Sequence, residues 1–310
     1  MTINKLEESE NSVLGLKTNP QYSDLKKKIG VAVITCNRLE FLENLLKSLI
    51  PCADSINNFV IINDGKPFSE VDMFSLDKAH SDRVDNICNL YIELGADWVD
   101  NETNLGVCKS KNKAMQHLLD QGCDYIFVIE DDMIILDPNI FSKYIEAHEK
   151  SGIHHFMFGY HGPANKANIS KGKPVPRIVI DYKDFKIALN QHCVGAMCFY
   201  TRESLLSVGL NDEEFNKNNF EHVEHSYRLA KAKYSTPYWW WADLANSTDY
   251  IAEQACSEDN TVIHRDDWME KIKWSALLFE KKHGYLPAWN NPVPDTPIEK
   301  VVQFLKDIKP

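Results

Sequence analysis

The stretch Asp124–Asp137, DYIFVIEDDMIILD, decides how the rest of the chain is interpreted. Its first part, Tyr125–Ile129, is a short apolar run rich in β-branched residues, which is typical of a strand buried on both faces. Three acids, Glu130, Asp131 and Asp132, follow at once before the chain becomes apolar again. Because like charges repel, three carboxylates at the end of a buried strand indicate a partner of opposite charge.

A divalent cation is one such partner. Mg²⁺ and Mn²⁺ prefer hard oxygen ligands and leave room for phosphate oxygens. In an extended strand alternate side chains share a face, so we expect Glu130 and Asp132 to point one way and Asp131 the other. A solvated acidic loop is the competing interpretation, and the position directly after a buried strand favours the metal site.

Strands and helices alternate in the first half of the chain. Strands are expected at 29–37, 57–65, 97–101 and 125–132, and helices at 38–50 and 107–122. This order predicts a doubly wound α/β arrangement, in which ligands bind at the carboxyl ends of the strands. The triple acid falls at that edge.

The second half has a more mixed pattern. We expect a hairpin from 176–182 and 185–189, a strand at 194–202, a helix within 211–234, and closing helices at 266–284 and 297–308. The predicted organisation is a polar extension at 1–25, an α/β domain at 26–265 and a helical segment at 266–310.

Composition excludes several classes of protein. The formal net charge of −11 argues against a nucleic-acid binder. No apolar run reaches the roughly 18 to 20 residues that cross a bilayer, and the N-terminus has no apolar signal-peptide core. The eight cysteines are scattered without a CxxC pair, which indicates a reducing compartment. We therefore expect a cytoplasmic protein without a transmembrane segment.

Five motifs, in order, resemble those of glycosyltransferase family 2 and related GT-A enzymes. They are VITCNRLEFLENLLKSL, INDG, NLGVCKSKNKAM, IEDDMII and GLNDEEFNKNNFEHVEHSYRLAKAKY, and the likeness spans about residues 28–235. The resemblance implies a GT-A fold, in which a Rossmann-like nucleotide-binding half and a mixed central sheet are followed by C-terminal helices. It also implies a nucleotide-sugar donor, with UDP expected, and a cofactor that is Mn²⁺ or Mg²⁺.

The family's metal-binding motif aligns with the triple acid. The resemblance implies that Asp132 binds the metal, that Glu130 meets the ribose or a metal-bound water, and that Asp131 supports them. His264 stands where many GT-A enzymes supply another metal ligand near the C-terminus. One isolated histidine is more often structural.

Residues around the first two strand ends are implied in nucleotide binding. Asp64 stands where the family places an acid that accepts a hydrogen bond from the base. The usual preceding acid is Asn63 here, so the choice between the two stays open. Thr35, Asn37 and Arg38 would flank the base.

Asn104 precedes the helix expected at 107–122, which carries three lysines, Lys109, Lys111 and Lys113. Lys111 stands where the family often has arginine, and an ammonium group there can meet a diphosphate as a point charge. The same resemblance places Asn104 in the donor site. A solvated helix face is an equally good interpretation of the lysines.

The segment FEHVEHSYRL departs from the W-E-D-V-D motif of related enzymes. In those enzymes an acid of the motif is the base that deprotonates the acceptor hydroxyl. Glu221 and His222 are the candidates. We favour Glu221 narrowly, because a carboxylate at this position matches the family. If Glu221 is buried, we expect desolvation to raise its pKa and make it a better base. Glu224 is a third possibility and an acceptor-binding candidate. His222 and His225 are three apart, which excludes the HExxH zinc motif.

A tryptophan cluster in PYWWWADL suits an acceptor platform, since sugar rings stack on indoles. Trp240 and Trp241 are the candidates, and core packing is at least as good an interpretation.

The predicted function is a metal-dependent, inverting transfer of a hexosyl or N-acetylhexosaminyl group from a UDP-sugar to a glycan or other hydroxyl acceptor. By analogy the product would be a bacterial surface polysaccharide. A non-catalytic nucleotide-sugar or glycan-binding domain and a sugar-phosphate nucleotidyltransferase are the alternatives. The second should carry a glycine-rich loop after the first strand, and TCNRLEF has none.

Overall fold

The computed structural model describes residues 27–67, 78–162, 165–166, 178–182, 184–215, 220–236, 240–254, 265–284 and 298–307. In the first half these residues form β1 (Ile29–Thr35), α1 (Leu39–Leu49), β2 (Asn58–Asn63), α2 (Lys78–Glu93), β3 (Ala96–Asp100), α3 (Val107–Asp120), β4 (Tyr125–Glu130), β5 (Met133–Ile135) and α4 (Ile140–Ser151). Then come β6 (His155–Met157), β7 (Ile178–Tyr182), β8 (Phe185–Asn190), β9 (Met197–Thr201), α5 (Arg202–Val208), α6 (Glu221–Lys231), β10 (Trp241–Leu244), β11 (Ile251–Glu253), α7 (Arg265–His283) and α8 (Ile298–Asp307).

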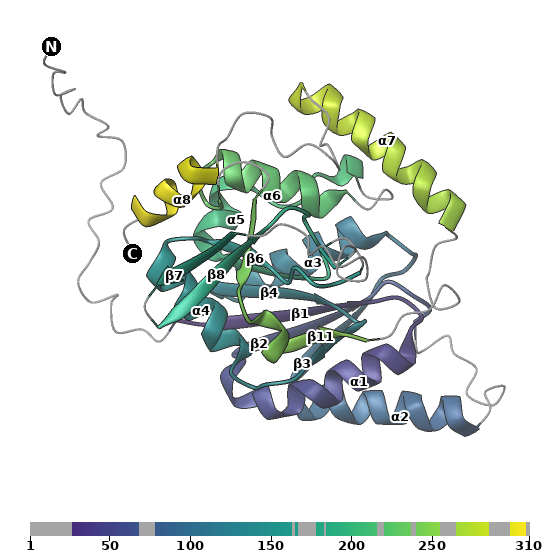
Figure 1. The fold of residues 1–310 in the computed structure, drawn as a ribbon. Coiled ribbons are helices and arrows are strands. Elements are labelled where there is room, and N and C mark those ends of the chain that lie inside the picture. The colour runs from purple at the N-terminus through teal and green to yellow at the C-terminus, as the bar shows by residue number, and fades with distance from the viewer. Residues whose placement is uncertain are drawn as a thin grey trace, which may run out of the picture.

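A mixed sheet of six strands lies at the centre, in the order β3-β2-β1-β4-β9-β6 (Figure 1). The strands from β3 to β4 are parallel, whereas β9 runs antiparallel to β4 and to β6. Two smaller antiparallel sheets, β10-β8-β7 and β11-β5, complete the topology. The chain thus has the expected α/β fold, with a parallel half continued by a mixed half.

The apolar runs of the central strands form the core. Residues Val31–Ile34 of β1 and Ile126–Ile129 of β4 are buried on both sides, as strands between two helical layers must be. Helices α1 and α2 lie together on one side of the sheet, and α3, α5 and α6 lie on the other (Figure 1). Leucines of α1 fill the space against the sheet.

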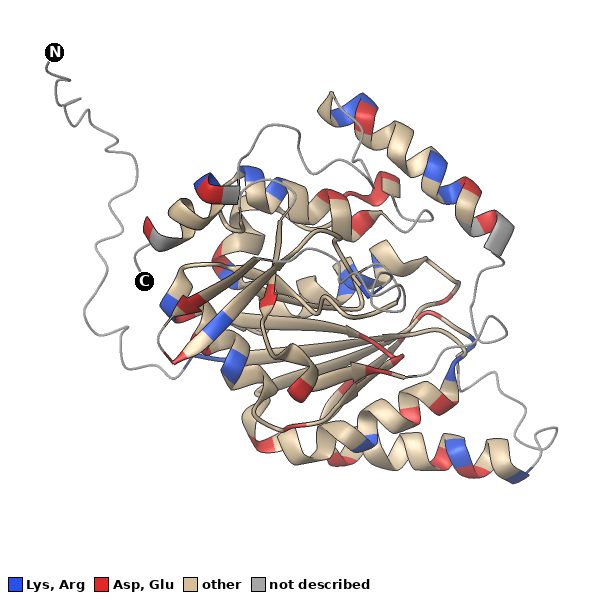
Figure 2. Cartoon of the chain, viewed as in Figure 1, with Lys and Arg blue, Asp and Glu red and all other residues tan. Residues whose placement is uncertain are grey.

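Register aligns the carboxyl ends of the central strands. Thr35 at the end of β1 pairs with Asn63 at the end of β2, and Ile34 pairs with Glu130 at the end of β4. The polar residues that follow these strands therefore meet at one edge. Figure 2 shows acidic segments gathered at that edge.

The predicted strands and the predicted helices are all present, including the β7–β8 hairpin. Helix α2 was not expected, because only Val84 and Ile87 are buried along it and its apolar pattern is weak. Helices α4 and α5 were also missed. The extension at 1–25 lies outside the described residues, and the division at residue 265 stays a prediction.

Helix α7 departs from the expected amphipathic pattern. Ile272, Leu278 and Phe279 are buried, but Trp274 and Leu277 are largely exposed. The helix is therefore apolar on two faces. None of the helices in the described part of the chain is both long and apolar enough to cross a membrane.

Candidate active site

The acidic residues after β4 meet an arginine. Strand β4 ends at Glu130, and Asp131 and Asp132 form a turn. Both aspartates contact Arg38, which bonds Asp132 Oδ2 through Nη1 at 3.0 Å and Asp131 through Nη2. Thr35 donates its hydroxyl to Asp131 Oδ2 at 2.7 Å. The predicted alternation of side chains is wrong beyond Glu130, because the extended conformation ends there.

The two aspartates differ in pKa because their partners differ. Burial raises the pKa of Asp131 to about 7, although Arg38 and Thr35 oppose the shift. Burial also disfavours the ionised form of Asp132, but His161 and Arg38 outweigh it and lower the pKa to about 2. Asp132 is thus a carboxylate at neutral pH, the state that a metal ligand requires.

The backbone of this turn is fixed by Gln254, which sequence reasoning missed. Its main-chain N–H donates to Asp132 O at 2.6 Å. Its side-chain Nε2 donates to the carbonyls of Asp131 at 3.0 Å and of Met133 and Phe41 at 2.9 Å each. One amide thereby ties the turn to α1. A separation of 123 residues from Asp131 leaves no local signal in the sequence.

His161 also faces the turn and was missed. It lies in the turn after β6, and its Nε2 is 3.3 Å from Asp132 Oδ2. Burial lowers the pKa of His161, but Asp132, Glu130 and Glu253 outweigh this and raise it. The side chain is 26% exposed, so the imidazole reaches the surface beside the acids.

Lys111 of α3 lies between two acids rather than facing an open site. Its Nζ donates to Glu130 Oε1 at 2.7 Å, to Glu221 Oε1 at 3.0 Å and to Gly195 O at 3.0 Å. The residue is 5% exposed. Burial opposes its charge, yet Glu130 and Glu221 raise its pKa. All three ammonium protons are engaged, so the expected diphosphate contact has no donor in this arrangement.

Glu221, at the start of α6, is 1% exposed. Its Oε1 accepts from Lys111 and lies 3.3 Å from His222 Nδ1. Its Oε2 has no hydrogen-bond partner among the described residues. Burial alone would raise the pKa of Glu221, but Lys111 and His222 lower it well below the usual range. The expectation that burial makes Glu221 a stronger base is therefore wrong.

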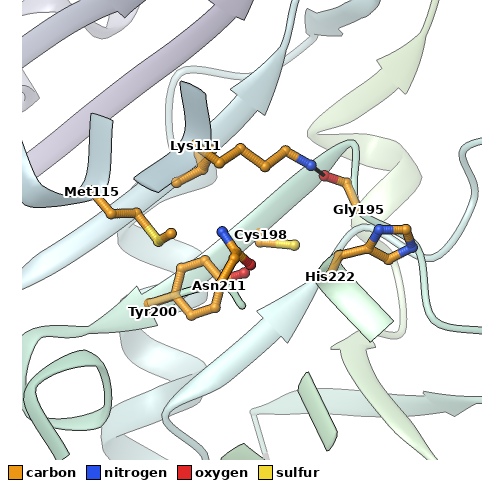
Figure 3. Close-up of a pocket in the computed structure, with 8 residues that line it drawn as sticks. Lys111, Met115, Gly195, Cys198, Tyr200, Asn211 and His222 are labelled. Atoms are coloured by element: carbon orange, nitrogen blue, oxygen red, sulfur yellow. Dashed lines mark hydrogen bonds between the residues drawn. The ribbon is translucent and has the colours of Figure 1, made fainter. Parts of the chain in front are cut away.

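His222 is the more accessible of the two predicted bases, with its side chain 18% exposed against 2% for Glu221. Figure 3 shows it at a small pocket beside Lys111 and Gly195. A Cβ atom on Gly195 would lie 2.6 Å from His222 Cγ, so only glycine lets the ring adopt this position. The other lining residues are Met115, Val128, Cys198, Tyr200 and Asn211, and the pocket is too narrow to admit a water molecule.

The residues predicted around the nucleotide base anchor the loop before α3. Asp64 accepts from the main-chain N–H of Leu105 at 2.7 Å and of Gly106 at 2.9 Å. Asn104 Nδ2 donates to the carbonyl of Asp64 at 3.0 Å. Asn37, with a φ of 56°, accepts from Lys66 N at 2.8 Å. These bonds shape the edge where β1 and β2 end, and the predicted base contacts stay predictions.

Three acceptor candidates are placed in the interior instead. Trp240 and Trp241 are 4% and 2% exposed, which favours core packing, and the stacking platform stays a prediction. Glu224 is buried, and both its oxygens accept from Arg228 Nε at 2.9 Å. Its Oε1 also lies 3.2 Å from His283 Nε2. Glu224 thus links α6 to α7, which assigns it a structural contact.

The acidic turn carries side chains of the kinds that bind divalent metals. Within the described ranges, no group of three or more His, Cys, Asp or Glu side chains is suited to hold one. Asp132 and His161 do provide a carboxylate oxygen and an imidazole nitrogen side by side. Mn²⁺ accepts both ligand types, and substrate phosphates complete such sites. The pair therefore fits the cation. His264 lies outside the described residues.

No protein-family model matches the chain, and no curated protein is similar to it in sequence. Solved structures do share its arrangement. The mannosyltransferase PcManGT from Pyrobaculum calidifontis, in complex with GDP-Man and Mn²⁺, is 13% identical at a TM-score of 0.46, covering 69% of this chain and 56% of that one. TarS 1–349 from S. aureus, in complex with UDP-GlcNAc, is 15% identical at a TM-score of 0.48. The match covers 82% of this chain and 66% of that one.

A third similar structure is the glucosyl-3-phosphoglycerate synthase from Mycobacterium tuberculosis with Mn²⁺, UDP and glucosyl-3-phosphoglycerate. It is 11% identical at a TM-score of 0.47, covering 84% of this chain and 81% of that one. The chain spans less than two thirds of the length of PcManGT and about two thirds of TarS 1–349. Likenesses this distant carry no argument about activity, which rests on the site of this chain alone.

Proposed function

We propose that the chain is a metal-dependent, inverting glycosyltransferase that moves a sugar from a nucleotide donor, a UDP-sugar, to a hydroxyl group of a glycan. One observation carries the proposal. A continuous series of charged contacts joins the acidic edge of the sheet to the start of α6, from Glu130 through Lys111 and Glu221 to His222, over 2.7, 3.0 and 3.3 Å. Such a series connects a donor site with a base.

The donor side lies at the acidic turn. A bound Mn²⁺ or Mg²⁺ would neutralise the diphosphate that leaves when the sugar is transferred. Asp132 holds this cation in the proposal. Thr35 and Arg38 keep Asp131 in place next to Asp132. The loop tied down by Asp64 and Asn104 would flank the nucleotide base.

The base in the proposal is His222 rather than Glu221. A carboxylate whose pKa is held low by the ammonium group of Lys111 takes up a proton poorly at neutral pH. Imidazole is a common general base in catalysis. Glu221 Oε1 accepts from the Nδ1–H of His222, which leaves Nε2 to take the proton.

The transfer then balances simply. The acceptor oxygen forms a bond to the anomeric carbon while the bond from that carbon to the diphosphate oxygen breaks. The acceptor proton passes to His222 Nε2, and the nucleoside diphosphate leaves with the bonding electrons. Lys111 keeps Glu221 ionised, so that it can stabilise the imidazolium that forms.

The test is incubation of the full chain with Mn²⁺ and a panel of nucleotide sugars, followed by release of the nucleoside diphosphate. We expect metal-dependent release from one class of donor. His222→Asn should lower kcat by about 10²- to 10⁴-fold with the donor's KM little changed. Glu221→Gln should cost less and shift the pH profile. Absence of release from every donor would reject the proposal, and the reverse order of the two variants would return the base to Glu221.

A non-catalytic nucleotide-sugar-binding domain is the second candidate. Two observations favour it: the ammonium protons of Lys111 are all engaged, and the pocket at His222 admits no water. Calorimetry separates the two functions. Binding of an intact nucleotide sugar without any turnover over hours would support the second candidate.

A further inference from the structure

We infer that His161, together with Asp132, is a protein ligand of the divalent cation. The inference rests on the cation of the proposed function and assigns it a ligand that the sequence motifs do not contain. His161 stands 29 residues after Asp132, in the turn that follows β6. Only the fold brings it to the end of β4.

The distance between the two side chains suits a shared cation. His161 Nε2 and Asp132 Oδ2 are 3.3 Å apart. Two neighbouring ligands in octahedral coordination, at right angles and about 2.1 to 2.2 Å from the metal, lie about 3.0 Å apart. The same separation also allows the ion pair that the two side chains make with each other. The pair is therefore spaced as adjacent ligands are.

The turn that carries His161 is held in place independently of this contact. Gly162 N donates to Glu253 Oε2 at 2.5 Å, and Lys166 also pairs with Glu253. Glu253 belongs to β11, where it stands opposite Met133, the residue after Asp132. The backbone of the histidine turn is thus tied to the strand pair that carries the acidic turn. Supports of this kind orient metal ligands.

A cation held by Asp132 and His161 would need further ligands. Mg²⁺ and similar cations in phosphate-transferring sites take the rest of their coordination from phosphate oxygens and water. Arg38 contacts Asp131 as well as Asp132, so it keeps a carboxylate partner when a cation takes Asp132 Oδ2.

The test measures nitrogen coordination directly. Mn²⁺ is added to the full chain alone and with UDP, and pulsed electron paramagnetic resonance records the ¹⁴N modulation of a coordinated imidazole. We expect the modulation in the wild type, and replacement by ¹⁵N-histidine should change its frequencies. His161→Asn should abolish it and weaken Mn²⁺ binding by at least about tenfold. Unchanged circular dichroism and melting temperature would show that the variant is folded.

Two matched variants make the result specific. His264→Asn removes the other candidate nitrogen ligand and should leave the signal in place. His117→Asn removes an imidazole that also faces a carboxylate, Asp97, at 2.9 Å on the far end of α3. It should change neither the signal nor Mn²⁺ affinity.

The outcomes separate this inference from the proposed function, because the measurement needs no turnover. Retention of the ¹⁴N modulation in His161→Asn, its loss in His264→Asn, or its absence from the wild type would each overturn the inference. A clear His161 signal in a chain that transfers no sugar would reject the enzymatic proposal and leave the metal site standing.

Discussion

Replacing Lys111 with methionine removes the only cation that directly bonds both Glu130 and Glu221 among the described residues. Methionine keeps the length and apolar stem of lysine, so the change tests charge rather than packing. Glu130 can turn to solvent, because its side chain is 24% exposed. Glu221 is buried and cannot turn to solvent, and its Oε2 already lacks a hydrogen-bond partner among the described residues. The cost should therefore come mainly from Glu221.

The expected magnitude follows from burial. Removing one partner of a buried ion pair leaves an uncompensated charge and costs about 3 to 5 kcal/mol. We expect the free energy of unfolding of Lys111→Met to fall by about that amount near pH 7.5. Urea denaturation followed by tryptophan fluorescence measures it, with unchanged slope against denaturant as the check on a two-state transition.

The free energy of unfolding of the variant should also depend on pH in a different way from that of the wild type. In the wild type the pKa of Glu221 is lower in the folded than in the unfolded chain. Ionised Glu221 therefore stabilises the fold at every pH above the unfolded pKa of about 4.3. This stabilisation is lost as the pH falls through the folded pKa. In Lys111→Met burial raises the pKa of Glu221, so ionisation destabilises the fold. The stability of the variant should therefore rise relative to wild type between pH 7.5 and 5.

Two further variants control the experiment. Lys113→Met lies two residues along α3, is exposed and bonds only Asn101 in the described part of the chain, so it should change stability by less than about 1 kcal/mol. Adding Glu221→Gln to Lys111→Met should recover most of the loss. A Lys111→Met protein within about 1 kcal/mol of wild type at pH 7.5 would refute the reasoning.

Three other predictions concern the site. Asp132→Ala should abolish Mn²⁺-dependent UDP binding in calorimetry while melting stays cooperative; unchanged affinity would remove Asp132 from the metal site. Gly195→Ala should displace the ring of His222 and lower kcat by about tenfold or more with little change in donor affinity, and a normal kcat would contradict the crowding. Gln254→Ala should remove the hydrogen bonds that hold the acidic turn, lowering the free energy of unfolding in urea by about 1 to 3 kcal/mol and weakening Mn²⁺ binding. Wild-type values for both quantities would show that the turn does not depend on Gln254.

Much of the fold follows from local pattern. The apolar runs of β1, β2 and β4 predict buried strands, and a parallel sheet brings their carboxyl ends to one edge. The gathering of Asp64 and the triple acid at that edge is thus predictable. Helix α2 is not, because its two buried residues leave no clear period.

The tertiary structure decided which charged side chains meet. Arg38 reaches Asp132 across 94 residues, and Lys111 reaches Glu221 across 110. The spacing within an element determines which face a residue occupies on that element, but not what packs against that face. The same limit explains Trp241, whose apolar ring suits either a sugar or the core until its neighbours are known.

Sequence alone therefore determined the α/β architecture and the acidic edge, because strand period and charge are properties of short segments. The sequence left the protonation state of each acid undetermined. Two buried acids, Asp131 and Glu221, have pKa values shifted in opposite directions. Burial prevails at Asp131, whereas at Glu221 the contacts with Lys111 and His222 outweigh burial. A pKa depends on every charge and every solvent-excluding atom nearby, and those neighbours come from distant parts of the chain that only folding brings together.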